Sequence, residues 1–227
     1  VLTALEVLCL KIAGMPLYDA LIHAFSTAGT GGFSNRNASV GAYNSAAIDI
    51  IITIFMLLFS INFAAYFLIL TKKWREALAS DELRFFLSVV AGATAIITLA
   101  NLGVYASVWE SLRYTAFQVA SIISTTGFGT ADFVLWPKFS QMIIVLLMFC
   151  GASAGSTGGG MKCSRVLILL RAIRREVHRI THPRSVEVVK LDGKLVSEAT
   201  LHTLLVFLGA YVATVFAAAL VISLDGQ

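Results

Sequence analysis

Apolar residues in this chain fall into long runs that are separated by polar connections. Three runs, 46–70, 85–106 and 199–220, reach the roughly 20 mostly apolar residues that a helix needs to cross a membrane. A shorter run, 1–13, is expected to be the end of another span. A further run stops at a glycine-rich stretch and resumes beyond it, which predicts one crossing helix, 139–180, that is broken in the middle.

Two shorter apolar stretches lie on connections between these runs and are too short to cross a bilayer, which is typical of re-entrant segments. Each leads into Ser, Thr and Gly residues and then returns. At an offset of 95 residues the two segments align without gaps, with Ser26 on Ser121 and Gly32 on Gly127. This internal repeat predicts two units with the plan helix, re-entrant loop, helix.

The physics of such a loop favours a cation path. Backbone that is not helical is tolerated at membrane depth only where it is buried in protein or lines a wet cavity. Glycine allows carbonyl groups to point inward at dihedral angles that other residues avoid, and a ring of carbonyls can replace the water shell of a monovalent cation. The helix before each loop would aim its negative C-terminal end at the same place. Ordinary turns between spans are the alternative, and two copies in register disfavour it.

Composition and charge support a membrane protein. Apolar residues make up 58% of the chain and charged residues 13%, which is about half the charged share of an ordinary soluble domain. Cys9, Cys150 and Cys163 have neither the spacing of a disulfide framework nor that of a metal finger. Basic residues gather in the connections 71–84 and 171–198, so the positive-inside rule predicts that both are cytoplasmic.

The opposite face carries carboxylates, which would suit a cation at the mouth of a pore but could equally be solvated surface. They are Asp19, Asp49, Glu110, Asp132 and Asp225. Two of them, Asp19 and Glu110, stand at the start of the short helices, where an acidic side chain complements the helix dipole.

The glycine-rich stretch 151–162 reads GASAGSTGGGMK. Its glycines and small polar residues disfavour helix and leave backbone groups that need partners. Small residues also allow helices to pack closely, which is the alternative interpretation. A phosphate-binding loop is excluded because Met161 stands where that motif requires lysine, and no strand precedes it.

Other candidate sites are weaker. His178 and His182 are four residues apart, as in a metal pair, but no acidic residue or cysteine completes that site in the sequence, so solvated cytoplasmic histidines are the better interpretation. The basic run around them, next to a span, is better explained by topology and anionic headgroups than by nucleic acid. No catalytic constellation is visible, so we expect no enzyme.

Three segments carry a resemblance to a known family: HAFSTAGTGGFSNRNAS, STTGFGTADFVLWP and GASAGSTGGGMK. With them the chain resembles the Trk/Ktr/HKT superfamily of potassium transporters, specifically its bacterial TrkH/KtrB membrane subunits. The resemblance implies an all-α membrane protein of repeated helix–re-entrant pore loop–helix units around a pseudo-fourfold ion pore. Two loops cannot close such a ring, so we expect the chain to be part of a longer protein.

The resemblance assigns residues 1–70 to the second repeat of that fold. This repeat would comprise the end of its first helix, a pore helix with its filter loop at 16–34, and a second helix at 44–70. A cytoplasmic connection at 71–84 would follow. At the other end of the chain, residues 199–227 would form the first helix of the fourth repeat.

Residues 85–180 would form the third repeat. It would hold a helix at 85–106, a pore helix and filter at 110–130, and the broken helix with an intramembrane loop at 151–161. A second cytoplasmic connection would follow at 181–198.

The resemblance also implies two sets of functional residues. The filter backbone would bind the ion at Gly29, Thr30, Gly31, Gly32, Ser124, Thr125, Thr126 and Gly127. The intramembrane loop would lie under the filter as a gate, with the residues Gly151, Gly155, Ser156, Thr157, Gly158, Gly159, Gly160 and Lys162.

The implied function is potassium uptake across the cell membrane, in a multi-pass protein of the inner or plasma membrane. Potassium would be the substrate, with no cofactor and no transition-metal site in this chain. Expected partners are the lipid bilayer, a second copy in a homodimer, and a cytoplasmic nucleotide-binding regulatory subunit of the TrkA/KtrA kind that binds the nucleotide itself. No nucleic acid is expected.

Two other functional classes stay open at this point. A secondary transporter with broken helices, for another cation or a small solute, would explain the discontinuous span but not the two loops in register. A membrane scaffold or receptor would not depend on the loop glycines. The first filter loop of the family is absent from the sequence, so the preference for potassium over sodium is open.

Overall fold

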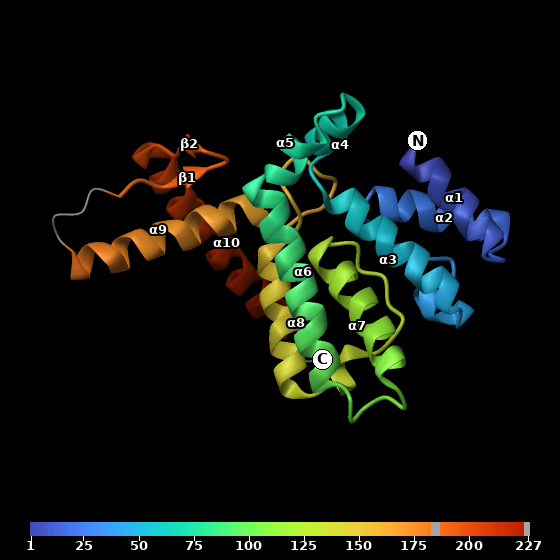
Figure 1. Ribbon diagram of the computed structural model, residues 1–227. Coiled ribbons are helices and arrows are strands. Elements are labelled where there is room, and N and C mark those ends of the chain that lie inside the picture. The colour runs from blue at the N-terminus through green and yellow to red at the C-terminus, as the bar shows by residue number, and fades with distance from the viewer. Residues whose placement is uncertain (183–186, 225–227) are drawn as a thin grey trace. The chain divides into compact units, whose positions relative to one another are not determined.

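The computed structural model describes residues 1–182 and 187–224 and consists mainly of helices (Figure 1). It divides into two units, residues 1–163 and 164–227, which are described separately. The first unit contains both predicted re-entrant loops and the glycine-rich stretch.

The first unit repeats one arrangement of three helices. In the first copy these are α1 (Leu2–Ile12), α2 (Leu17–Ala28) and α3 (Ala46–Ser60). In the second copy they are α6 (Asp81–Ala100), α7 (Val108–Ile123) and α8 (Lys138–Cys150). Within each copy the three helices lie side by side (Figure 1). The predicted plan of helix, short helix and helix is therefore confirmed in both copies.

Shorter elements connect these helices. The short 3₁₀ turns η1 (Ser39–Tyr43) and η2 (Phe133–Leu135) follow the two re-entrant segments. Helices α4 (Phe63–Leu70) and α5 (Trp74–Ala79) lie between the two copies.

The core of this unit lies where the two copies meet. Ile52 and Met56 on α3 and Phe117 and Ala120 on α7 are buried in one apolar cluster, together with Leu10 from α1. Burial of apolar surface is the dominant favourable term in folding, so this cluster fixes α7 against α3. The loops that follow α2 and α7 are thereby brought to one place.

Local sequence explains where the second short helix begins. Ser107 caps α7 by accepting a hydrogen bond from the Glu110 amide (3.1 Å). The Glu110 carboxylate in turn accepts one from the Ala106 amide (3.2 Å). A serine followed three residues later by glutamate satisfies amide groups that a helix start leaves without partners.

The predicted second helix at 44–70 is not continuous, which corrects that expectation. Helix α3 ends at Ser60, α4 begins at Phe63, and the two differ in direction by 92°. Asn62 caps α4 by accepting a hydrogen bond from the Ala64 amide (2.8 Å), a position that asparagine prefers to the interior of a helix. Asn62 therefore supports the start of α4 after the interruption.

Helix lengths agree with a membrane protein. Among the described residues, α6 and α10 (Glu198–Ser223) are long and apolar enough to cross a membrane, and the bent pair α3 and α4 would add a third crossing if it forms one span. Helix α6 begins at Asp81 and ends at Ala100, earlier at both ends than the expected 85–106. Ser80 precedes it, and two acidic residues in its first turn suit a helix start.

The second unit contains α9 (Cys163–Thr181), a two-stranded antiparallel hairpin and α10. The strands β1 (Lys190–Leu191) and β2 (Lys194–Leu195) are joined through Asp192 and Gly193, both with positive φ, as in a type I′ turn. The predicted connection at 181–198 thus contains a hairpin. Part of it, residues 183–186, lies outside the described residues.

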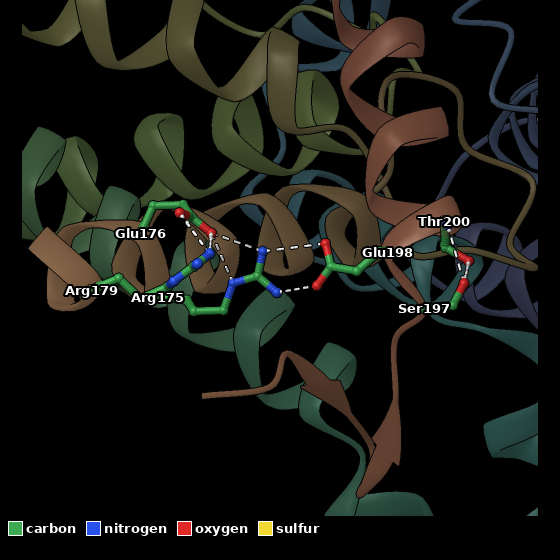
Figure 2. A network of polar contacts seen from close by, with 6 residues as sticks. All are labelled: Arg175, Glu176, Arg179, Ser197, Glu198 and Thr200. Atoms are coloured by element: carbon green, nitrogen blue, oxygen red, sulfur yellow. Dashed lines mark hydrogen bonds and ion pairs between the residues drawn. The ribbon is translucent and has the colours of Figure 1, made fainter. Parts of the chain in front are cut away.

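Ion pairs join α9 to α10 within the second unit (Figure 2). Arg175 lies between two carboxylates: its Nη1 is 2.5 Å from Glu198 Oε1 and its Nε is 3.0 Å from Glu176 Oε1. Arg179 adds a contact of 3.3 Å to Glu176. At the start of α10 the Ser197 hydroxyl accepts a hydrogen bond from the Thr200 amide (3.2 Å).

Candidate functional site

The two filter loops follow the C-terminal ends of α2 and α7 and repeat the same backbone hydrogen bonds. The amide of Gly31 donates to the carbonyl of Ser26 (2.8 Å), and at the same offset the amide of Thr126 donates to Ser121 (3.0 Å). Gly29 and Ser124, two residues before these donors, are the C-terminal caps of α2 and α7. The internal repeat read from sequence therefore extends to individual hydrogen bonds.

The same dihedral pattern occurs in both loops. Thr30 and Thr125 have φ of +48° and +60°, and Gly32 and Gly127 have φ of +67° and +87°. Left-handed backbone is ordinary for glycine but is an outlier for a β-branched residue such as threonine. Strain of this kind is typical of functional sites.

The two filter loops are in direct contact. A Cβ atom on Gly32 would lie 2.2 Å from the carbonyl oxygen of Thr126, so no other residue fits there without moving backbone. At Gly127 the surrounding space is open, and glycine is required by the positive φ alone. Beyond the filter, the Gly41 amide donates to the Gly129 carbonyl (3.1 Å) and ties the two returning segments together.

A buried histidine supports the returning segments, and sequence reasoning missed it. His23 on α2 donates from Nδ1 to the carbonyl of Asp19 (2.8 Å), so its Nε2 accepts from the hydroxyl of Ser34 (3.0 Å). Its ring stacks on Phe128, with ring centroids 5.5 Å apart. A histidine four residues after an aspartate in an otherwise apolar short helix was the available signal.

Asp19 does more than complement the dipole of α2. Its carboxylate accepts hydrogen bonds from Tyr43 (2.6 Å), Asn35 (2.6 Å) and Arg36 (3.0 Å). The Tyr43 hydroxyl, followed by Asn35 and Arg36, lowers the pKa of the Asp19 carboxyl to about 2. This cluster fastens the segment that returns from the first filter loop to the start of the helix before it.

The acidic mouth expected on this face is therefore only partly present. Asp19 is almost fully buried in its cluster, and Asp49 is buried in an ion pair with Arg113, whose Nε lies 2.7 Å from its carboxylate. That pair joins α3 to α7 across the contact between the two copies. Of the remaining acidic residues expected there, Asp225 lies outside the described residues.

The predicted intramembrane loop, residues 151–161, exchanges backbone hydrogen bonds with the break between α3 and α4. The amides of Ser153 and Thr157 donate to the carbonyls of Ser60 (3.0 Å) and Phe59 (3.4 Å), and the Phe63 amide donates to the Gly155 carbonyl (3.0 Å). Helix ends leave such groups without partners inside the helix. The two interruptions therefore satisfy each other, which sequence reasoning missed because it expected no break after Ser60.

Glycines let the loop turn tightly on itself. Gly151, Gly155 and Gly160 have φ of +71°, +71° and +78°. A Cβ on Gly151 would lie 2.7 Å from the Gly159 carbonyl oxygen. The Ser156 hydroxyl donates to the Ser153 carbonyl (2.6 Å).

Two charged side chains hold the loop from within the first unit. The Nζ of Lys162 donates to the Gly158 carbonyl. The Glu82 carboxylate, in the first turn of α6, accepts from the Ala154 amide (2.6 Å). Lys162 was expected here, whereas Glu82 was missed because it lies about seventy residues away in the sequence.

The intramembrane loop also contacts both filter loops. Thr125 Oγ1 accepts a hydrogen bond from the Gly159 amide (2.6 Å). The Thr30 hydroxyl lies within donor distance of the Thr157 carbonyl (3.2 Å) as well as of the Gly29 carbonyl (2.8 Å). A Cβ on Gly158 would lie 2.8 Å from the carbonyl oxygen of Ser124. The structure therefore brings all the predicted filter and gate segments to one place.

No group of three or more His, Cys, Asp or Glu side chains suited to a metal ion occurs within residues 1–182 and 187–224. His178 and His182 do stack, with ring centroids 4.5 Å apart, and His178 Nδ1 lies 2.8 Å from Glu187.

Comparison with known proteins agrees with this geometry. Residues 8–227 match the family model described as "TrkH: Cation transport protein". The Trk system potassium uptake protein TrkH of Salmonella typhimurium is 37% identical over 217 residues, covering 92% of this chain and 44% of that protein. The protein of the same name from Halomonas elongata is 37% identical over 222 residues, covering 95% of this chain and 45% of its own length.

A solved structure supports the same assignment. The crystal structure of the potassium transporter TrkH from Vibrio parahaemolyticus matches with a TM-score of 0.90 at 34% identity, covering 96% of this chain and 47% of that one. The chain thus spans about half the length of the relatives it matches. It is a membrane protein, and it belongs to the TrkH family of cation transport proteins.

Proposed function

We propose that this chain supplies two filter loops and an intramembrane gate to a potassium uptake protein of the cell membrane. One observation carries the proposal: the loops after α2 and α7 share hydrogen bonds and left-handed backbone at equivalent positions, and they contact each other through Gly32 and Thr126. Relatives named as potassium uptake proteins support potassium as the substrate.

The filter would work through backbone carbonyls. The segments Gly29–Gly32 and Ser124–Gly127 would present carbonyl oxygens to the ion in place of its water shell, as rings of carbonyls do in cation filters. Both segments follow the C-terminal end of a short helix, where the helix dipole favours a positive charge. Further loops of the complete protein would close the ring.

The gate would be the intramembrane loop between α8 and α9. It lies against both filter loops, and hydrogen bonds from its backbone to Phe59, Ser60 and Thr125 hold it in one position. The Nζ of Lys162 donates to the Gly158 carbonyl, so this side chain also holds the loop in its folded shape. Retraction of the loop would open the path.

Two glycine variants of the complete protein test the filter. In Gly32→Ala the new Cβ would meet the Thr126 carbonyl oxygen at 2.2 Å, so the backbone of both loops must shift. Gly127→Ser, at φ of +87°, acts on the backbone alone. We expect both to lower the discrimination of potassium against sodium by about tenfold, which corresponds to about 1.4 kcal/mol. Tracer uptake into proteoliposomes measures it.

Gly92→Ala is the matched control, because a Cβ at Gly92 in α6 meets nothing within 4 Å and the backbone there is helical. It should leave the ion preference at the wild-type value. Wild-type ion preference in folded Gly32→Ala and Gly127→Ser proteins would remove these loops from the filter.

A further inference from the structure

The positions of Thr30 and Thr125 raise a physical question. Both residues are β-branched, and both have left-handed φ, at +48° and +60°. Such a conformation is strained for a residue of this kind. Glycine would adopt it without strain, and glycine is already used two positions later, at Gly32 and Gly127. A threonine side chain must therefore supply something that glycine lacks.

Their hydroxyl groups provide the answer. Thr125 Oγ1 accepts a hydrogen bond of 2.6 Å from the Gly159 amide. The Thr30 hydroxyl is within donor distance of two carbonyls, Gly29 at 2.8 Å and Thr157 at 3.2 Å. Equivalent residues of two repeats thus contact the same short segment of the intramembrane loop.

The loop is shaped to allow this approach. A Cβ on Gly158 would lie 2.8 Å from the Ser124 carbonyl oxygen, and one on Gly159 would lie 3.2 Å from Thr125 Oγ1. Side chains at these two positions would push the loop away from the filter. The glycines of the loop and the threonines of the filter therefore form the contact together, because the absence of side chains at Gly158 and Gly159 leaves room for it.

We propose that Thr30 and Thr125 are positioning residues whose hydroxyl groups hold the intramembrane loop against the filter, so that loop release and filter geometry are coupled. This inference rests on the proposed function of the loop as a gate. Retraction breaks both contacts at once and frees two strained residues of the filter to relax. By linkage, the free energy by which the retained loop favours this filter geometry equals the free energy by which this filter geometry favours the retained loop.

The coupling gives the ion itself a role in gating. A cation bound to the second lone pair of Thr125 Oγ1 withdraws electron density from this oxygen and so weakens the hydrogen bond that it accepts from the Gly159 N–H. It also repels the positive end of that N–H bond. Occupancy of the filter by potassium therefore favours release of the loop, and flux rises more steeply with potassium concentration than simple saturation allows.

Thr125→Val in the complete protein tests the inference, because valine keeps the shape and removes the oxygen. We expect resting potassium flux to rise severalfold and the steep dependence on potassium to flatten. Hydrogen exchange of the loop amides, residues 151–162, should accelerate about tenfold, whereas exchange in α8 stays at the wild-type rate. Thr125→Ser restores the hydroxyl and should return both readouts toward wild type.

A second variant keeps the test decisive if valine impairs folding. Gly159→Ala presses on the same contact from the loop side, where the new Cβ would lie 3.2 Å from Thr125 Oγ1. It should raise resting flux and loop exchange as Thr125→Val does. Because both changes remove one contact, the double variant should show clearly less than the sum of the two effects.

The outcomes separate this inference from the gate on which it rests. If a shortened loop raises resting flux but folded Thr125→Val and Gly159→Ala proteins show wild-type flux and exchange, the gate stands and the coupling is wrong. Additive effects of the two changes would also overturn the coupling. If shortening the loop leaves flux at or below the wild-type level, the gate assignment itself fails.

Discussion

At the scale of single residues, the correspondence between the two loops was more predictable than the side-chain contacts that support them. Pairing Gly32 with Gly127 needed only the internal repeat, because the two loops have the same local task and the same backbone. The partners of Asp19 were not predictable in this way. The helix dipole already explained an aspartate at the start of a helix. Nothing in the sequence therefore indicated that Arg36 or Tyr43 would contact it.

The Asp19 cluster predicts a pH dependence. Its pKa is about 2 in the folded protein and about 3.9 for an ordinary aspartate, so the ionised form favours the folded state. That stabilisation is complete above about pH 5 and is lost as pH falls toward 2. Asp19→Asn should therefore lower the melting temperature at pH 7, and its deficit relative to wild type should shrink between pH 5 and pH 3.

Thermal unfolding of the complete protein in detergent measures this difference. Asp132→Asn is a suitable control, because Asp132 is exposed and caps only the short turn η2. A deficit of Asp19→Asn that stays constant across this pH range would show that packing, and not ionisation, is what the substitution removes.

At the scale of elements, the interruption of 46–70 was the main expectation that failed. The run is mostly apolar, with Asp49, Thr53, Ser60 and Asn62 as its polar residues, and length alone favoured one span. The break is stabilised by a partner that lies about ninety residues further along the chain, the loop around Ser153 and Gly155. Patterns within a segment cannot reveal a partner at that distance, whereas the glycine-rich loop itself was evident from its composition.

The loop as an element gives a second expectation. Removing residues 156–159 from the complete protein should raise resting potassium flux, because the contacts to Phe59 and Thr125 are lost. Because the loop contacts both filter loops, the preference for potassium over sodium should fall as well. Flux in proteoliposomes, with each cation in turn, measures both quantities.

Glu82 offers a milder change of the same element. Glu82→Ala leaves the Ala154 amide without its acceptor, which typically costs about 1–3 kcal/mol for a buried group. Glu82→Ala should raise resting flux, but by less than the deletion does. The flux of Glu82→Gln should be closer to the wild-type value. Glu76→Ala, at an exposed position on α5, is the control. For the deletion of residues 156–159, a resting potassium flux below the wild-type value would contradict the expectation that the loop obstructs the path.

At the scale of the whole molecule, the fold class followed from sequence because membrane spans are constrained by length and by backbone satisfaction. The repeat then supplied the order of elements. The hairpin within 181–198 was not predicted, since two-residue strands give too short a pattern, although the pair Asp192 and Gly193 is a known hairpin turn. The contact between Arg175 on α9 and Glu198 on α10 was not predictable either. The hydrophobic pattern does not specify the path of the connection between these two helices.

Assembly is the prediction at this scale. We expect the complete protein to form a homodimer and to retain a cytoplasmic nucleotide-binding subunit through the basic connections 71–84 and 171–198. Light scattering in detergent and co-purification with a TrkA-type protein measure the two properties. Charge reversal at Arg174, on α9, should weaken retention of the subunit without dissociating the dimer. A monomer that retains no such subunit would contradict both parts.

The hydrogen bonds between the loop after α8 and the break between α3 and α4 determine how much water must enter when the loop moves. If the loop moves away, the amides of Ser153 and Thr157 and the carbonyls of Phe59 and Ser60 lose their hydrogen-bond partners. Leaving such groups bare at membrane depth costs several kcal/mol each. Water must therefore enter as the loop leaves, and each opening is also a local wetting of the protein interior. If this loop is the gate we propose, its position would respond to the activity of water in the cell.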